Sequence, residues 1–380
     1  MPGKTPGRNQ NEALLEGEGE VALSQAQKIR LRFMRHKLGV VGGAIIVFLY
    51  VVVTLAPFLS PYGFEVQHPE YSLAPPTGIH FSNGKRFSLR PYTYSITKAR
   101  DPITLELTYQ VDREKSYPIY FFVRGEKYDI IGGWKGNLHL FGADRNSGGA
   151  VFLFGTDRFG RDLFTRTLIG GRVSMTVGVF GILLSFIIGI LVGGVSGYYG
   201  GWMDNLIQRV IELLRSFPRL PLWLALSMVL PPQWSSVAVY FGVVTILSLI
   251  DWTGLARVIR GQFLSLREKE FVQAARAIGA SDASIILRHM LPNTMSYLIV
   301  SATLSFPGMI IGESSISFLG LGIKEPMTSW GLLLKDAQSL EALNLHPWLM
   351  IPGIFIIVAV LAFNFVGDAM RDAFDPYSKM

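Results

Sequence analysis

Residues 271–293 form a polar, basic segment between two long apolar runs. Residues 274–276 favour a short helix, and Gly279 is suited to end it, because glycine accepts the left-handed turn that closes helices. Ser281 can cap a second helix, whose end Pro292 would mark. A helix-turn-helix on one face of a membrane suits docking to a soluble partner that moves, although the segment could also be an ordinary connecting loop.

The spacing of this segment resembles the "EAA" loop of permease subunits of binding-protein-dependent ABC importers. The family pattern has two alanines, three further residues, a glycine and a later Leu-Pro, and its loop inserts into a cleft of the ATPase subunit. Two positions depart from it, since Gln273 replaces the usual Glu and His289 replaces a hydrophobic residue. Losing the Glu weakens any argument from its charge but not the helix-turn-helix geometry. The resemblance implies an ATPase-coupling loop over 257–293 with these residues: Gln273, Ala274, Ala275, Arg276, Gly279, Ser281, Asp282, Leu291 and Pro292.

Three further motifs resemble the C-type subunit of the dipeptide/oligopeptide permease subgroup. They are Gly-Thr-Asp-Arg-Phe-Gly-Arg-Asp at 155–162, the stretch 312–331 with its Gly-Glu-Ser-Ser-Ile-Ser and Ser-Trp-Gly, and 364–376 near the C-terminus. The first is, in itself, a polar turn leading into a helix, with Asp162 suited to the helix N-terminus. The resemblance covers 28–60 and 155–380 but not 65–150, where the insertion is longer than the subgroup predicts.

Composition independently indicates a membrane protein. The mean hydropathy is +0.35 and 49% of residues are hydrophobic, which exceeds the usual soluble range. The net charge of +7 does not require nucleic acid, because much of it falls where positive charge sets membrane topology. The chain has no cysteine, which excludes disulfides and thiolate chemistry but does not decide the compartment.

The predicted fold is an all-α polytopic membrane protein with six transmembrane helices and an inserted, mostly β, extracytoplasmic domain between helices 1 and 2. The six apolar runs are 39–59, 173–199, 206–230, 237–256, 294–312 and 348–366. Basic residues before the first run place the N-terminus in the cytoplasm, and six spans return the C-terminus to the same side. A cleaved signal peptide is the alternative, but the apolar run is too extended for one.

This topology predicts four parts. They are a cytoplasmic tail with a basic segment at 1–38, transmembrane helix 1 at 39–59, an extracytoplasmic domain at 60–168, and a permease core at 169–380 with five transmembrane helices. Alternating runs at 103–109, 117–123 and 128–131 predict strands in the inserted domain. Its many basic residues do not contradict the topology, because long loops translocate largely regardless of charge.

Two features at membrane depth have more than one interpretation. Glu313, near the outer end of the fifth span, could face the translocation path or serve a structural role, and we favour the structural role. Gly189, Gly193 and Gly197 let helices approach closely, either within the chain or against a second subunit. No catalytic motif, cofactor site or metal-ligand spacing occurs in the sequence, and His80 and His139 are expected to be ordinary surface or core residues.

The resemblance implies a non-enzymatic permease subunit of a peptide importer in the inner or plasma membrane. It implies as partners a second homologous permease subunit, two ATP-binding subunits that hold ATP and Mg, an extracytoplasmic solute-binding protein and membrane lipid, but no nucleic acid. The same machinery could import oligosaccharides or nickel. An ATP-independent transporter and a membrane sensor are alternatives from other classes. The first should show an acid or histidine relay at membrane depth, and the second a cytoplasmic signalling domain.

Overall fold

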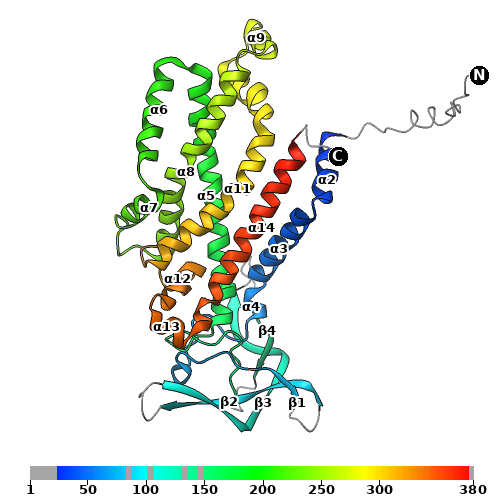
Figure 1. The fold of residues 1–380 in the computed structure, drawn as a ribbon, viewed down its shortest axis with the longest axis vertical. Coiled ribbons are helices and arrows are strands. Elements are labelled where there is room, and N and C mark those ends of the chain that lie inside the picture. Colours follow the sequence, from blue (N-terminus) through cyan, green and yellow to red (C-terminus); the bar gives the residue numbers. More distant parts are fainter. Residues whose placement is uncertain (1–23, 83–86, 101–106, 130–134, 144–148, 376–380) are drawn as a thin grey trace, which may run out of the picture.

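A computed structural model of the protein describes residues 24–82, 87–100, 107–129, 135–143 and 149–375. It shows an elongated bundle of long helices with a small antiparallel sheet at one end and the short helix α9 (Glu270–Ala277) at the other (Figure 1). We refer to these as the sheet end and the α9 end of the bundle.

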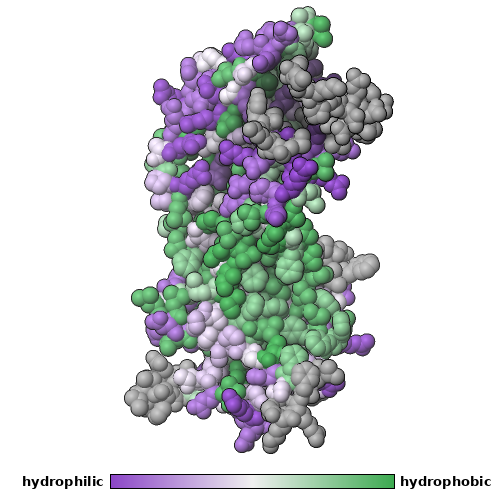
Figure 2. All heavy atoms as spheres, turned by 45° about the vertical axis from the view of Figure 1, so that its right-hand side comes forward, coloured by the Kyte–Doolittle hydropathy of each residue, from purple (hydrophilic) through white to green (hydrophobic). Residues whose placement is uncertain are grey.

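Within the described residues, five helices are long and apolar enough to cross a membrane. These spans are Lys37–Thr54, Leu163–Tyr199, Ser236–Leu266, Asp282–Phe318 and Pro347–Phe374, and they contain the helices α3 (Lys37–Thr54), α5 (Leu163–Tyr199), α8 (Ser236–Leu266), α11 (Leu291–Phe318) and α14 (Ile351–Phe374). On the face shown in Figure 2, hydrophobic residues form a broad band across the middle of the molecule, with hydrophilic residues toward both ends. The prediction of a mostly helical, polytopic membrane protein is confirmed.

The remaining helices are short and lie at the ends or the side of the bundle. They are α2 (Gln25–Arg35), α4 (Ala56–Leu59), η1 (Pro69–Tyr71), α6 (Gly201–Ser216), α7 (Arg219–Ser227), α9, α10 (Asp282–Ser284), η3 (Ile285–Met290), α12 (Trp330–Leu334), η4 (Lys335–Ala337), α13 (Leu340–Leu345) and η5 (Pro347–Met350). The basic helix α2 lies beside the end of α14, where Arg32 Nη1 donates to the carbonyl of Asp375 at 2.6 Å.

The third predicted span, 206–230, is not one continuous helix. The chain forms α6 and α7 there, with extended backbone at Phe217 and Pro218 between them. The proline explains the break, because its ring disfavours helical geometry at the residue that precedes it. Neither helix alone is among the five candidate spans, so the described residues contain five such helices where six were predicted.

Helices α5 and α8 pack closely against each other. The glycines at 189, 193 and 197 face α8, and a Cβ atom built at Gly197 would lie 2.7 Å from the carbonyl oxygen of Arg260. A Cβ at Gly193 would meet the backbone of Ala256. The glycine repeat therefore serves packing within the chain, which decides between the two interpretations of that motif.

The sheet has strand order β1-β2-β3-β4, and every pair is antiparallel. The strands are β1 (His80–Ser82), β2 (Phe87–Arg100), β3 (Leu107–Asp129) and β4 (Lys135–Ala143). The three short strands expected at 103–109, 117–123 and 128–131 are in fact one long strand, β3, as far as they lie inside the described residues. Irregular pairing at Tyr94/Ser95 and Arg124/Tyr128 lets this long strand bend without ending.

The sheet shares its core with the helical bundle. Ile119 and Phe141 pack with Val151 and with Phe164 of α5. His139 is buried at 2% exposure, and its two ring nitrogens lie 2.6 Å from the carbonyl of Ser60 and 3.1 Å from that of Glu126. His139 is thus a core residue that fastens β4 to the end of α4, as the sequence predicted for an ordinary histidine.

Gly193→Ala should destabilise the helix bundle. The added methyl group would meet the backbone of Ala256, which cannot move as a side chain tip can, and overpacking of this kind costs about 1–3 kcal/mol. Thermal unfolding of the detergent-purified protein measures the effect. Gly261→Ala on α8 is the matched control, because nothing lies within 4 Å of its Cβ position. Equal unfolding temperatures for the two variants would contradict the close approach of α5 and α8.

Candidate coupling loop and translocation cavity

The segment after α8 forms the predicted helix-turn-helix at the α9 end of the bundle (Figure 1). Helix α9 carries residues 273–276, and Gly279 follows it with a left-handed φ of +82°. The Ser281 side chain then accepts the backbone N–H of Ser284 at 3.4 Å and caps the next helix. The predicted first helix, the turn at Gly279 and the start of the second helix at Ser281 are confirmed.

The end of the second helix was predicted wrongly. Pro292 does not stop it, because Pro292 lies in the first turn of α11, where a missing N–H is tolerated. The π-helical turn η3 joins α10 to α11, and the whole stretch Asp282–Phe318 is one span. Leu291 and Pro292 therefore belong to the base of a membrane helix, and the loop is continuous with that helix.

A polar cluster ties this loop to the end of α5. Asp282 accepts hydrogen bonds from the hydroxyls of Tyr198 at 2.6 Å and Tyr199 at 3.2 Å, and the Arg276 guanidinium lies 5.4 Å from the centre of the Tyr198 ring. Gln273 donates to the carbonyl of Arg267 at 2.8 Å, a hydrogen bond that a Glu at this position could not donate. The cluster attaches the loop to the ends of α5 and α8.

Apolar burial reinforces this attachment on one side of the loop only. Val272, Ile285 and Met290 are fully buried against Ile259 and Phe263 of α8. The other side exposes three large apolar side chains: Phe271 at 41%, Ile278 at 86% and Leu287 at 57%. Large apolar side chains that gather on an exposed surface are typical of a protein contact site.

Glu313 of α11 is completely buried and hydrogen-bonded on several sides. It accepts from the hydroxyls of Ser317 at 2.7 Å and Ser174 at 3.0 Å. Ser174 of α5 in turn accepts the backbone N–H of Trp330, and Ser317 accepts that of Ile323. The carboxylate therefore connects α11, α5 and the segment before α12, and it is not among the residues that line the cavity described below.

A second polar cluster lies at the sheet end, around the start of α5. Arg161 donates to Asp157 at 2.7 Å and to Glu325 at 2.8 Å, and Arg166 donates to Glu325 at 3.1 Å. The hydrogen bond from Arg161 lowers the pKa of the Glu325 carboxyl. Asp162 caps α5 by accepting from the Thr165 backbone N–H at 2.9 Å, as the sequence predicted, and burial raises the pKa of Asp162 to about 7.

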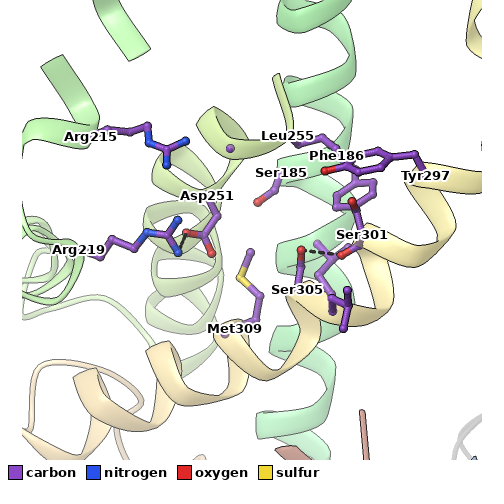
Figure 3. Close-up of a pocket in the computed structure, with 14 residues that line it drawn as sticks. Ser185, Phe186, Arg215, Arg219, Asp251, Leu255, Tyr297, Ser301, Ser305 and Met309 are labelled. Atoms are coloured by element: carbon purple, nitrogen blue, oxygen red, sulfur yellow. Dashed lines mark hydrogen bonds and ion pairs between the residues drawn. The ribbon is translucent and has the colours of Figure 1, made fainter. Parts of the chain in front are cut away.

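A cavity of about 430 Å³ opens at mid-depth between α5, α8 and α11, with α6 and α7 along one side (Figure 3). Its charged lining residues are Arg215, Arg219 and Asp251, and the Arg219 Nη1 atom lies 3.6 Å from Asp251 Oδ1. Hydroxyl groups of Ser185 and Ser305 also line it. Among the described residues, no group of three or more His, Cys, Asp or Glu side chains could hold a metal ion.

Comparison with known proteins adds the family. The sequence profile for "Binding-protein-dependent transport system inner membrane component" matches residues 175–379, and that for "N-terminal TM domain of oligopeptide transport permease C" matches residues 24–76. The chain belongs to the first of these families. It is therefore a permease component of an ABC transporter.

Individual relatives in this family carry peptide-transport names. "Oligopeptide transport system permease protein OppC" of Haemophilus influenzae is 45% identical over 224 residues, which is 59% of this chain and 70% of that protein. "Dipeptide transport system permease protein DppC" of Bacillus subtilis is 32% identical over 356 residues, or 93% of this chain and 87% of that protein. The two profiles leave residues 77–174 unmatched, and that stretch includes most of the segment 65–150 in which the sequence predicted an insertion.

Asp251 and its partner Arg219, both in the permease core, were not predicted from the sequence as functional residues. The signal was present, because Asp251 is the one acidic residue in the apolar run 237–256, and an ionisable residue at membrane depth marks a functional candidate. The Arg219 pairing could not be predicted, since it depends on the chain break at Pro218 that turns α7 toward α8.

Glu325→Gln should loosen the sheet-end cluster in a pH-dependent way. Because the folded-state pKa of Glu325 is lowered, the stabilisation is complete above the ordinary glutamate pKa of about 4.3 and is lost as the pH falls through the lower folded value. The side chain is 47% exposed, so we expect about 1 kcal/mol at neutral pH.

Thermal unfolding of wild type and Glu325→Gln at about pH 7 and about pH 3 checks this prediction. The gap between the two proteins should shrink at the lower pH. Glu341→Gln serves as the control, because Glu341 lies on the exposed surface of α13. A gap that stays constant with pH would show that the carboxylate charge of Glu325 does not matter.

Proposed function

We propose that this chain is the C-type transmembrane subunit of an ATP-driven importer for dipeptides or oligopeptides. Support comes from the peptide-transport names of its relatives, one of which is matched over 93% of this chain. In this proposal it pairs with a second homologous permease subunit and receives peptide from an extracytoplasmic solute-binding protein. Two separate ATP-binding subunits, which hold ATP and Mg, supply the energy.

The observation that carries the coupling role is the one-sided attachment of the loop at 257–293. Its inner side is fixed to α5 and α8 through Asp282 and Val272, while Ile278 and its exposed neighbours remain available to a partner. A force applied to α9 would therefore move the ends of both helices together. We assign ATPase coupling to this loop, with Gln273 forming a local hydrogen bond to the chain rather than a charged contact.

We further propose that the cavity at mid-depth is part of the peptide path and that Glu313 is a structural residue. Among the described residues, the side chains that donate hydrogen bonds to Glu313 are serines of the chain itself, which suits a fixed carboxylate. The cavity instead combines two arginines, an aspartate and small residues, which suits passage of a polar ligand.

The proposed topology places the α9 end in the cytoplasm and the sheet outside the cell membrane. Basic residues at the start of α3 and in the loop support this orientation. In this arrangement α6 and α7 together form the sixth crossing, interrupted at Pro218, and both termini are cytoplasmic. The proposal keeps the predicted arrangement of the chain relative to the membrane, with the four parts 1–38, 39–59, 60–168 and 169–380. The sheet then flanks the outer mouth of the path.

Gly279→Leu should uncouple ATP hydrolysis from transport. The residue has a φ of +82°, and leucine there costs about 1–2 kcal/mol, although a Cβ meets no atom within 4 Å. We expect normal membrane insertion. The turn should shift to relieve the strain, and ATP-driven tripeptide uptake should therefore fall at least about tenfold. Reconstituted importer in liposomes provides the measurement.

Gly279→Asn is the matched control for this variant, because asparagine tolerates left-handed backbone better than other residues do. It should keep most of the uptake. Full uptake by Gly279→Leu would exclude the coupling role, whereas failure of the wild-type importer to take up any peptide would exclude the proposed substrate class.

The topology can be tested by thiol labelling, since the chain has no native cysteine. Lys98→Cys on β2 should react with an impermeant reagent added to intact cells, because Lys98 is exposed on the sheet. Ile278→Cys should react only after permeabilisation, even though this side chain is 86% exposed. The opposite pattern would refute the orientation.

A further inference from the structure

The carboxylate of Asp251 differs from the other acidic groups buried in the helix bundle. Its side chain is 15% exposed, and among the described residues its Oδ1 atom is shielded from solvent without a hydrogen-bond partner. Its ion-pair partner, Arg219, is 3.6 Å away, which is longer than an N–H···O hydrogen bond. The pair balances charge but leaves the acceptor capacity of the carboxylate unused.

Two other acidic residues of the helix bundle, Asp204 and Glu313, do have hydrogen-bond donors. Asp204 accepts hydrogen bonds from Nε and Nη2 of Arg260, at 2.5 and 2.6 Å, and Glu313 accepts from serine hydroxyls. Those groups are satisfied by the chain itself. A carboxylate left without such donors at membrane depth is costly unless a ligand supplies them.

The position of Asp251 suits a ligand cation. Figure 3 shows it on the wall of the cavity with Arg219 and Arg215 on one side and the serines of α5 and α11 on the other. The side chain of Arg219 is 59% exposed, so it is free to turn away from Asp251. A cavity of about 430 Å³ lies in the range of small-ligand sites.

We propose that Asp251 binds the α-ammonium group of a peptide inside the translocation cavity, displacing Arg219, which together with Arg215 then faces the carbonyl or carboxylate oxygens of the same peptide. An ammonium group has three donors and fits a carboxylate that lacks them. The rest of the lining includes Gly254, Gly308 and Met309, together with the aromatic rings of Phe186 and Tyr297. Such a surface accepts varied side chains, since methionine adapts its shape.

This inference rests on the proposed peptide transport and adds where the chain recognises its substrate. After the peptide leaves, Arg219 can pair with Asp251 again, so the carboxylate is not left without a counter-ion. The site needs only the charged peptide terminus. It therefore predicts little discrimination by peptide sequence and strong discrimination against peptides whose amino group is blocked.

Thiol protection tests the site without transport. The assembled importer, in lipid nanodiscs without its solute-binding protein, carries Ser305→Cys, and mass spectrometry follows alkylation of the introduced thiol on this chain. Trialanine at about four times its dissociation constant should slow alkylation about fivefold. N-acetyl-trialanine should bind at least about tenfold more weakly, because it lacks the ammonium group.

Asp251→Asn in the same background should abolish the difference between the two peptides, and Leu340→Cys, at a site 79% exposed on α13, should be protected by neither. Equal protection by both peptides in the wild-type background, or no protection by trialanine, would overturn the proposal. So would an undiminished preference for trialanine in Asp251→Asn. Because this readout needs no ATP, a failure of ATP-driven uptake would count against the proposed function alone.

Discussion

The close approach of α5 and α8 is the contact on which the rest of the helix bundle depends. It exists because three glycines on α5 leave room for the backbone of α8, and helices in a membrane gain their association energy from close packing of this kind. The same two helices line the cavity near their middle and hold the loop at 257–293 at their end. A change in their relative position would therefore reach both places at once.

The distribution of buried charge follows a second constraint, since an ion at membrane depth must be compensated. The chain meets it in two ways. Glu313 is surrounded by hydroxyl donors that join α5, α11 and the segment before α12, which makes it part of the scaffold. Asp251 has only a loose ion pair at 3.6 Å, on the wall of a cavity. In the proposed function, the carboxylate of Glu313 is structural, and the carboxylate of Asp251 exchanges Arg219 for the peptide.

Much of this arrangement was predictable from sequence because its signals are local. Apolar runs identified the five long helices, and Gly279 and Ser281 marked the turn and cap of the loop. Local signals failed where an element depends on distant contacts. Pro292 was expected to end a helix, but it lies in a first turn that η3 leads into. Pro218 was overlooked inside an apolar run, so α6 and α7 were expected to be one helix.

The candidate functional residues were likewise predictable where their signal is local and not where it depends on distant contacts. The loop residues Gln273–Asp282 were found because a motif has fixed spacing, whereas the attachment of Asp282 to Tyr198 joins positions far apart in sequence. Asp251 was detectable as a lone acidic residue in an apolar run. Its inferred role, however, depends on its pairing with Arg219, which reaches it because the chain turns at Pro218.

The chain break at Pro218 explains why Asp251 has an ion-pair partner at all. A continuous third helix would carry Arg219 along its own axis, whereas the break directs the start of α7 toward the middle of α8. The break thus places an exposed counter-ion beside a carboxylate oxygen that has no hydrogen-bond partner among the described residues. In the proposed transport cycle, motion of the coupling loop would shift α8, and with it Asp251, relative to α7. The 3.6 Å separation would then change with the state of the ATPase subunits, which connects peptide release to ATP hydrolysis through one ion pair.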